Sequence, residues 1–145
     1  MANQDFFVEV LGEKTVLGKL DTMKVKVREE VKAVVNEAAL NIQRKAKRRT
    51  PVDTGRLRAS IHVKHFNNGL ASEVGSDVEY APYVEFGTGG FVEVPQGAQD
   101  YANQFRGKHP ANPGQHAQPY LYPAWEDEKP DFEAKLAAIL GKAGE

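Results

Sequence analysis

The sequence predicts an α+β domain in which a long amphipathic helix packs on a small antiparallel sheet. Three patterns predict this fold class. Apolar residues recur every three or four positions through 21–49, which is the period of one helix face. Apolar and polar residues alternate through 57–75, which is the period of a half-buried strand pair. A second helical pattern fills 123–140, and 145 residues are enough for a single domain with its own core.

Composition argues against several classes of function. The chain has 19 basic and 20 acidic residues and a net charge of -1, so no global field favours nucleic acid or a membrane. No apolar run is long enough to cross a bilayer, and the first residues lack the pattern of a signal peptide. The absence of cysteine excludes disulfides, thiol nucleophiles and thiolate metal sites.

The first predicted elements are a strand over 6–11, which ends at Gly12, and the helix over 21–49. Asp21 and Thr22 are candidate N-caps of that helix. Its apolar stripe comprises Leu20, Val27, Val31, Val34, Ala38 and Ile42. Because valine has a modest helix propensity, we expect packing to stabilise this helix.

The end of the first helix is strongly basic. It carries Arg44, Lys45, Lys47, Arg48 and Arg49. One interpretation is a phosphate-binding patch that contacts DNA. The other is a set of cations placed favourably at a helix C-terminus, each worth about 0.3–1 kcal/mol. The second is favoured, because few aromatic residues are interleaved and the whole chain is nearly neutral.

A corner separates the helix from the predicted hairpin. Pro51 ends the helix, Asp53 and Thr54 are turn formers, and Gly55 is predicted to have a positive φ. The hairpin over 57–75 turns at Asn68-Gly69, a pair that favours positive φ. The predicted core sets Val27, Val31, Val34, Ala38 and Ile42 against Leu57, Ile61 and Val63, closed by Trp125 and Leu136.

In the second half of the chain, two predicted ordered segments are separated by a long loop. A turn and a short strand are predicted over 80–87, followed by a flexible loop over 88–118 that is rich in Gly, Pro, Asn and Gln. Loops of this length are usually functional or disordered. Its aromatic residues are candidate anchors for a partner protein: Phe91, Tyr101 and Phe105. The C-terminal helix over 123–140 contains Pro130, which predicts a kink or two abutting helices.

No residue constellation predicts catalysis, a cofactor or a metal. His62 and His65 lie three apart on a predicted strand and therefore face opposite sides of it. Glu85 stands beside Tyr83 and Phe86 and is a candidate for a raised pKa. A lone carboxylate does not make an acid–base pair, and the alternative is a residue bonded to nearby backbone. The glycines after Phe86 lack the spacing and the lysine of a phosphate-binding loop.

Three segments together carry a resemblance to a known family. The first comprises Pro51, Thr54, Gly55, Leu57, Arg58, Ser60 and Ile61; the second Tyr80, Ala81, Val84, Glu85, Phe86, Gly87 and Thr88; the third Gln118, Pro119, Tyr120, Leu121, Pro123 and Ala124. In this order, after a basic amphipathic helix, they resemble the tail-completion (minor tail, head–tail joining) proteins of long-tailed double-stranded DNA phages and prophages. The family pattern usually has Phe at the position of Tyr120 and a basic residue at that of Tyr122.

The resemblance implies a structural virion protein without enzymatic activity, located in the neck or tail and assembled in the bacterial host cytoplasm. It implies a ring of copies, with six subunits matching the tail, beside head-closure and tail-terminator proteins. The alternative drawn from the residues themselves is a nucleic-acid-binding module that uses the basic helix end, Arg44–Arg49.

Overall fold

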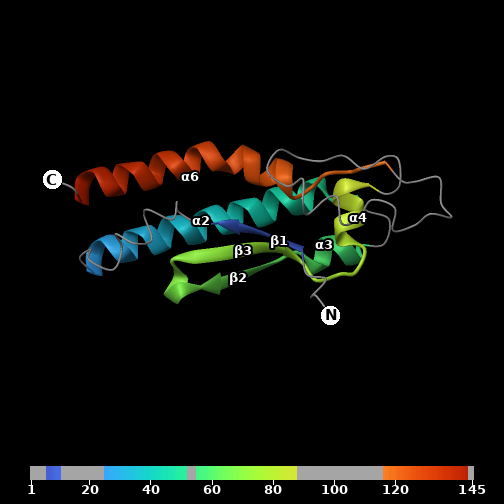
Figure 1. Ribbon diagram of the computed structural model, residues 1–145, viewed down its shortest axis with the longest axis horizontal. Helices are drawn as coiled ribbons and strands as arrows, with labels where there is room; N and C mark the ends of the chain where they lie inside the picture. The colour runs from blue at the N-terminus through green and yellow to red at the C-terminus, as the bar shows by residue number, and fades with distance from the viewer. Residues whose placement is uncertain (1–5, 11–24, 52–54, 88–115, 144–145) are drawn as a thin grey trace.

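The computed structural model describes residues 6–10, 25–51, 55–87 and 116–143. Helix α2 (Val25–Arg49) lies between a three-stranded sheet and the antiparallel helix α6 (Tyr122–Ala143), as Figure 1 shows. The short helices α3 (Arg56–Ser60) and α4 (Ala81–Phe86) gather at the end where α2 stops and α6 begins. The predicted α+β fold class is therefore confirmed. Among the described helices, none is long and apolar enough to cross a membrane.

Helix α2 forms the centre of the core because it is covered on two sides. Its buried residues are Val31, Val35, Ala38, Ala39, Ile42 and Ala46. The stripe is wider than a single packed face needs, and small alanines let the neighbouring elements approach closely. Val34, predicted at the centre of the core, is only half-buried, while Val35 is 1 % exposed. The sequence prediction missed this shift because it took a single row of apolar residues as the buried face, whereas contact with the sheet and with α6 buries a wider part of α2.

The sheet is antiparallel with strand order β1-β3-β2, so β3 (Ala71–Ser76) is central. Strand β1 (Phe6–Val10) pairs with β3 on one side, and β2 (His62–Phe66) pairs on the other with Val63 opposite Val74. The short 3-10 turn η1 (Asn67–Gly69) joins β2 to β3, and φ is positive at Asn68 and Gly69. The predicted Asn68-Gly69 turn is confirmed.

The predicted hairpin over 57–75 is wrong at its start. Residues 56–60 form α3, and β2 begins only at His62. Leu57 and Ile61 are both buried, as predicted, but Leu57 lies within α3 and Ile61 is the extended residue that directly follows it. A spacing of four fits the strand period and the helix period equally, so alternation alone could not separate the two. Ser60 Oγ donates to the Leu57 carbonyl at 2.6 Å, which is typical of a serine within a short helix.

The predicted turn and short strand over 80–87 are also corrected, since this segment is the helix α4. Pro82 stands in its first turn, where a missing N–H costs nothing, and the N–H of Val84 donates to the Tyr80 carbonyl at 3.2 Å. Gly87 ends the helix with φ 80° and ψ -177°, a conformation that is essentially restricted to glycine. Burial of Phe86 among helices outweighs the strand propensity of its aromatic neighbours.

The C-terminal helix is longer than predicted and runs through Pro130 as one element, so the alternative of two abutting helices is wrong. Pro130 is exposed, on the side of α6 away from α2. Phe132 and Leu136 pack into the core, and the rings of Trp125 and Phe132 lie 6.2 Å apart between centroids. The predicted closure of the core by Trp125 and Leu136 is confirmed, with Trp125 partly buried.

Candidate functional site

The carboxylate of Glu85 binds the start of α6 and joins two segments that are distant in sequence. Glu85 Oε2 accepts hydrogen bonds from the backbone N–H groups of Tyr120 at 2.7 Å and Leu121 at 3.0 Å. Oε1 accepts from the N–H of Tyr122 at 2.8 Å. The first N–H groups of a helix have no partner within it, and no Ser, Thr, Asp or Asn stands at the start of α6. Glu85 supplies the missing cap from α4.

Burial raises the pKa of Glu85 above its ordinary value, because water is excluded from the charged form. The hydrogen bonds from Leu121, Tyr120 and Tyr122 oppose this shift, since they stabilise the anion. The positive end of the α6 dipole acts in the same direction as those bonds. Within the described ranges Glu85 forms no ion pair, so backbone dipoles are what stabilise its charge. Burial, followed by the charge of Glu85, raises the pKa of Tyr122.

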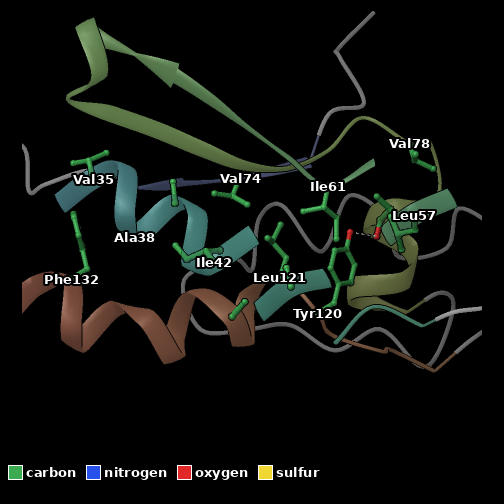
Figure 2. Close-up of a cluster of buried hydrophobic side chains, with 14 of the residues drawn as sticks. Val35, Ala38, Ile42, Leu57, Ile61, Val74, Val78, Tyr120, Leu121 and Phe132 are labelled. Atoms are coloured by element: carbon green, nitrogen blue, oxygen red, sulfur yellow. Dashed lines mark hydrogen bonds between the residues drawn. The ribbon is translucent and has the colours of Figure 1, made fainter. Parts of the chain in front are cut away.

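Further contacts join the same two segments. The N–H of Gln118 donates to the Val84 carbonyl at 2.8 Å. The hydroxyl of Tyr120, a fully buried residue, donates to the Ala81 carbonyl at 3.4 Å. Figure 2 shows the Tyr120 ring pointing toward Leu57 and Ile61, so the third motif segment also reaches the first. Gln118 and Tyr120, which precede α6, therefore lie beside α4.

The first motif segment joins this cluster through a corner at Gly55, which has φ 74° and ψ -9°. The predicted positive φ is confirmed. Ser60 Oγ lies 2.6 Å from Ser76 Oγ, which accepts the N–H of Val78 at 3.1 Å. These bonds connect α3 to the end of the central strand.

Surface contacts link the first and second motif segments. The guanidinium of Arg56 binds both carboxylate oxygens of Glu79, at 3.2 and 3.1 Å, and lies over the Tyr80 ring at 5.5 Å. Arg58 Nη2 donates to the Thr50 carbonyl at 3.4 Å, where α2 ends. All three motif segments thus meet at one end of the fold, around α3, α4 and the first turn of α6 (Figure 1).

The residues of the three motif segments differ in how deeply they are buried. Those buried in the cluster are Leu57, Ile61, Ala81, Glu85, Phe86, Gly87, Tyr120, Leu121 and Ala124. Pro51, Gly55, Arg58, Ser60, Tyr80, Val84 and Pro123 are half-buried, and Gln118 and Pro119 are exposed. Thr54, Thr88 and the candidate anchors Phe91, Tyr101 and Phe105 lie outside the described residues. Most of the motif therefore builds the fold, and its exposed remainder borders one end of the molecule.

The predicted basic helix end does not form one surface. Lys45 Nζ lies 2.7 Å from Asp127 Oδ2 and 2.9 Å from Glu128 Oε2 of α6. Glu128 is buried and also accepts from Asn41 Nδ2 at 2.9 Å. The contacts of Lys45 therefore fix the position of α2 along α6. The pKa of Lys45 is raised by its hydrogen bonds to Asp127 and Glu128. Arg44, Arg48 and Arg49 are exposed, and Lys47 is half-buried.

The histidines of β2 have ordinary local partners. His62 Nδ1 lies 2.7 Å from the Ser60 carbonyl, and His65 Nδ1 lies 2.8 Å from Ser72 Oγ. In the part of the chain that the structure describes, no three His, Asp or Glu side chains gather in a way that could hold a metal ion.

The sequence pointed to Glu85 as a candidate for a raised pKa, with bonding to nearby backbone as the alternative. The pKa is raised, and the backbone partners lie 35 to 37 positions away. A weak signal was present in the sequence. A helix that begins at Tyr122-Pro123 without a capping side chain of its own needs an acceptor from elsewhere.

Comparison with known proteins supports the resemblance. The model of the family described as "Bacteriophage HK97-gp10, putative tail-component" matches residues 14–87, about half of the chain. This range holds α2, α3, β2, β3 and α4, and with them the first two motif segments up to Gly87. Searches of curated proteins and of solved structures returned no match. The chain belongs to the HK97-gp10-like family of bacteriophage tail components.

Proposed function

We propose that this tail component acts at the phage head–tail junction, where it completes the tail or neck so that a filled head can join. It acts as a subunit of a closed ring of identical copies, with six subunits to match the tail, and meets head-closure and tail-terminator proteins. A closed ring of this kind needs two complementary contact surfaces on each subunit, each held in one shape so that the repeated contact closes.

The observation that carries the proposal is the convergence of all three motif segments at one end of the fold. Glu85 fixes this end by binding three backbone N–H groups of a second element. The exposed Pro119 lies directly beside that buried clamp. The buried hydrogen bonds of Glu85 hold the neighbouring exposed residues in one conformation before a partner binds. A surface that is already ordered loses less conformational entropy on association.

Electron microscopy of particles made without this gene tests the proposal. We expect DNA-filled heads beside finished, unattached tails, and joined particles when the full chain is supplied from a plasmid. Joined particles in the absence of the gene would contradict a role at the junction. Absence of finished tails would place the chain in tail assembly instead.

The ring is tested separately by native mass spectrometry of the purified chain. The subunit mass is 16.0 kDa, so a closed hexamer appears at six times that value. The same measurement is made after addition of purified tails, so that a ring that forms only on its partner is also detected. A chain that is monomeric in both samples would contradict the ring.

A further inference from the structure

The five cations between Arg44 and Arg49 fall into two sets that the structure separates. Lys45 is bound to Asp127 and Glu128 of α6. Arg49 is one turn beyond Lys45 and shares its side of α2. The charge of Arg49 adds to the effect of Lys45, which is the main cause of the lowered pKa of Asp127. Lys45 and Arg49 therefore interact with the acidic residues of α6 where α2 packs against it.

The second set comprises Arg44, Lys47 and Arg48, named here the outer cation patch. Lys47 and Arg48 stand three and four positions after Arg44, so each of them neighbours Arg44 on the surface of α2. Arg44 and Arg48 are exposed, and within the described ranges none of the three forms an ion pair. Among the described elements, their charge is therefore not used to hold one element against another.

A favourable interaction with the helix dipole does not account for the whole patch. The last turn of α2 contains Lys47, Arg48 and Arg49. The dipole acts within about one turn of a helix end, and Arg44 lies before that turn. Arg44 is exposed, and neither the helix dipole nor an ion pair within the described ranges accounts for it, so its charge is available to an external anion.

We propose that the outer cation patch contacts the phosphates of double-stranded DNA that passes the head–tail junction. The proposal rests on the proposed function, because that position brings the chain beside DNA. Two of the three residues are arginines, whose planar forks bind phosphate oxygens in pairs. Arg44 and Arg48 are separated by about 6 Å along the helix, and each DNA strand carries a charge about every 3.4 Å of its axis, so the patch faces several phosphates.

The rest of the chain explains why such contact is weak and reversible. The net charge is -1, so no long-range field holds DNA to the protein. A small set of phosphate contacts without base contacts is independent of sequence and lets DNA slide. A protein beside moving DNA needs both properties.

The test compares the full chain with the triple variant Arg44→Gln, Lys47→Gln and Arg48→Gln. Fluorescence anisotropy with a labelled duplex measures the binding constant between roughly 50 and 200 mM salt. The matched control removes the same charge elsewhere, through Lys26→Gln, Lys32→Gln and Lys129→Gln. We expect the slope of log K against log salt to fall by about 2.7 in the triple variant, which is about 0.9 for each phosphate lost. The control variant should keep most of the slope.

Three results would overturn the proposal. The first is that the unmodified chain shows no salt-dependent DNA binding. The second is that the control variant loses as much of the salt slope as the triple variant. The third is that the triple variant binds DNA unchanged while its oligomeric mass has changed. The last result would assign the patch to an acidic protein surface. Circular dichroism and thermal unfolding show that both variants are folded. The DNA assay does not depend on particle assembly, so its failure is distinguishable from failure of the head–tail joining experiment.

Discussion

Glu85 and Tyr120 are 35 positions apart, and the Glu85 carboxylate accepts the backbone N–H of Tyr120 at 2.7 Å. The same carboxylate binds the next two N–H groups along the chain, at 3.0 and 2.8 Å. One side chain thus caps a helix of 22 residues from a helix of six. The start of α6 and the placement of α4 are therefore coupled through Glu85, beside the contacts of Gln118 and Tyr120 with α4.

Replacement Glu85→Gln is expected to lower the free energy of unfolding by about 1–3 kcal/mol, the cost of leaving a buried donor without an acceptor. Gln has a single oxygen, so its NH₂ group must face the N–H of Tyr122 or those of Tyr120 and Leu121. Urea unfolding followed by circular dichroism measures the change. Glu126→Gln is the control: it is exposed near the start of α6 and should change stability by about 0.5 kcal/mol or less. Equal effects of the two substitutions would contradict the capping role.

The raised pKa of Glu85 predicts a specific dependence on pH. A carboxyl whose pKa is higher in the folded than in the unfolded chain stabilises the fold most below the unfolded value, near 4.5. That contribution is lost as pH rises through the folded pKa. The stability advantage of the wild type over Glu85→Gln, which does not titrate, should therefore be larger at low pH and shrink toward neutrality. An advantage that grows with pH would show that the three N–H bonds outweigh burial.

Gly55→Val is expected to destabilise the fold by about 1–3 kcal/mol, because φ is 74° at this corner. A Cβ at Gly55 meets no atom within 4 Å, so the cost comes from the backbone and not from a clash. Gly55→Asn should cost much less, since asparagine tolerates this conformation. Gly141→Ala in α6 is the matched control: it also has open space, lies within a helix, and should stabilise by about 0.5–1 kcal/mol. Thermal unfolding of the three variants distinguishes these outcomes.

Val35→Asp should unfold the domain, because it places an unpaired charge in the centre of the core at a cost of several kcal/mol. Val34→Asp should be milder, since Val34 is only half-buried and its carboxylate can reach water. The sequence pattern predicted Val34, and not Val35, as the buried residue, so the two substitutions test the burial that the structure shows. Circular dichroism of both variants provides the comparison, and equal loss of structure would contradict the placement of Val35 at the core centre.

Deletion of 91–115 with a short Gly-Ser bridge should leave the fold intact. The contacts of Glu85 and the bond from Gln118 to Val84 hold the two flanks together without the deleted residues. We expect an unchanged melting temperature, with filled heads and finished tails that fail to join. Normal infectivity of the deletant would show that Phe91, Tyr101 and Phe105 are not partner anchors and would direct attention to other surfaces.

The sequence by itself determined the parts of this protein that depend on local chemistry and long periodicity. Apolar spacing located α2 and α6, because many repeats of the helix period leave no other face to bury. Gly55 and Asn68-Gly69 marked their corners, because few residues adopt a positive φ. The ordered motif segments carried the resemblance that the family match confirmed.

Only the tertiary structure decided the rest. Leu57 and Ile61 are four apart, a spacing that a strand and a helix share, so packing at the end of α2 selected the helix. Lys45 was separated from Arg44 and Arg48 by the position of α6, which no local pattern records. The role of Glu85 depends on N–H groups 35 to 37 positions away, and such a partner is set by how elements pack and not by neighbouring residues.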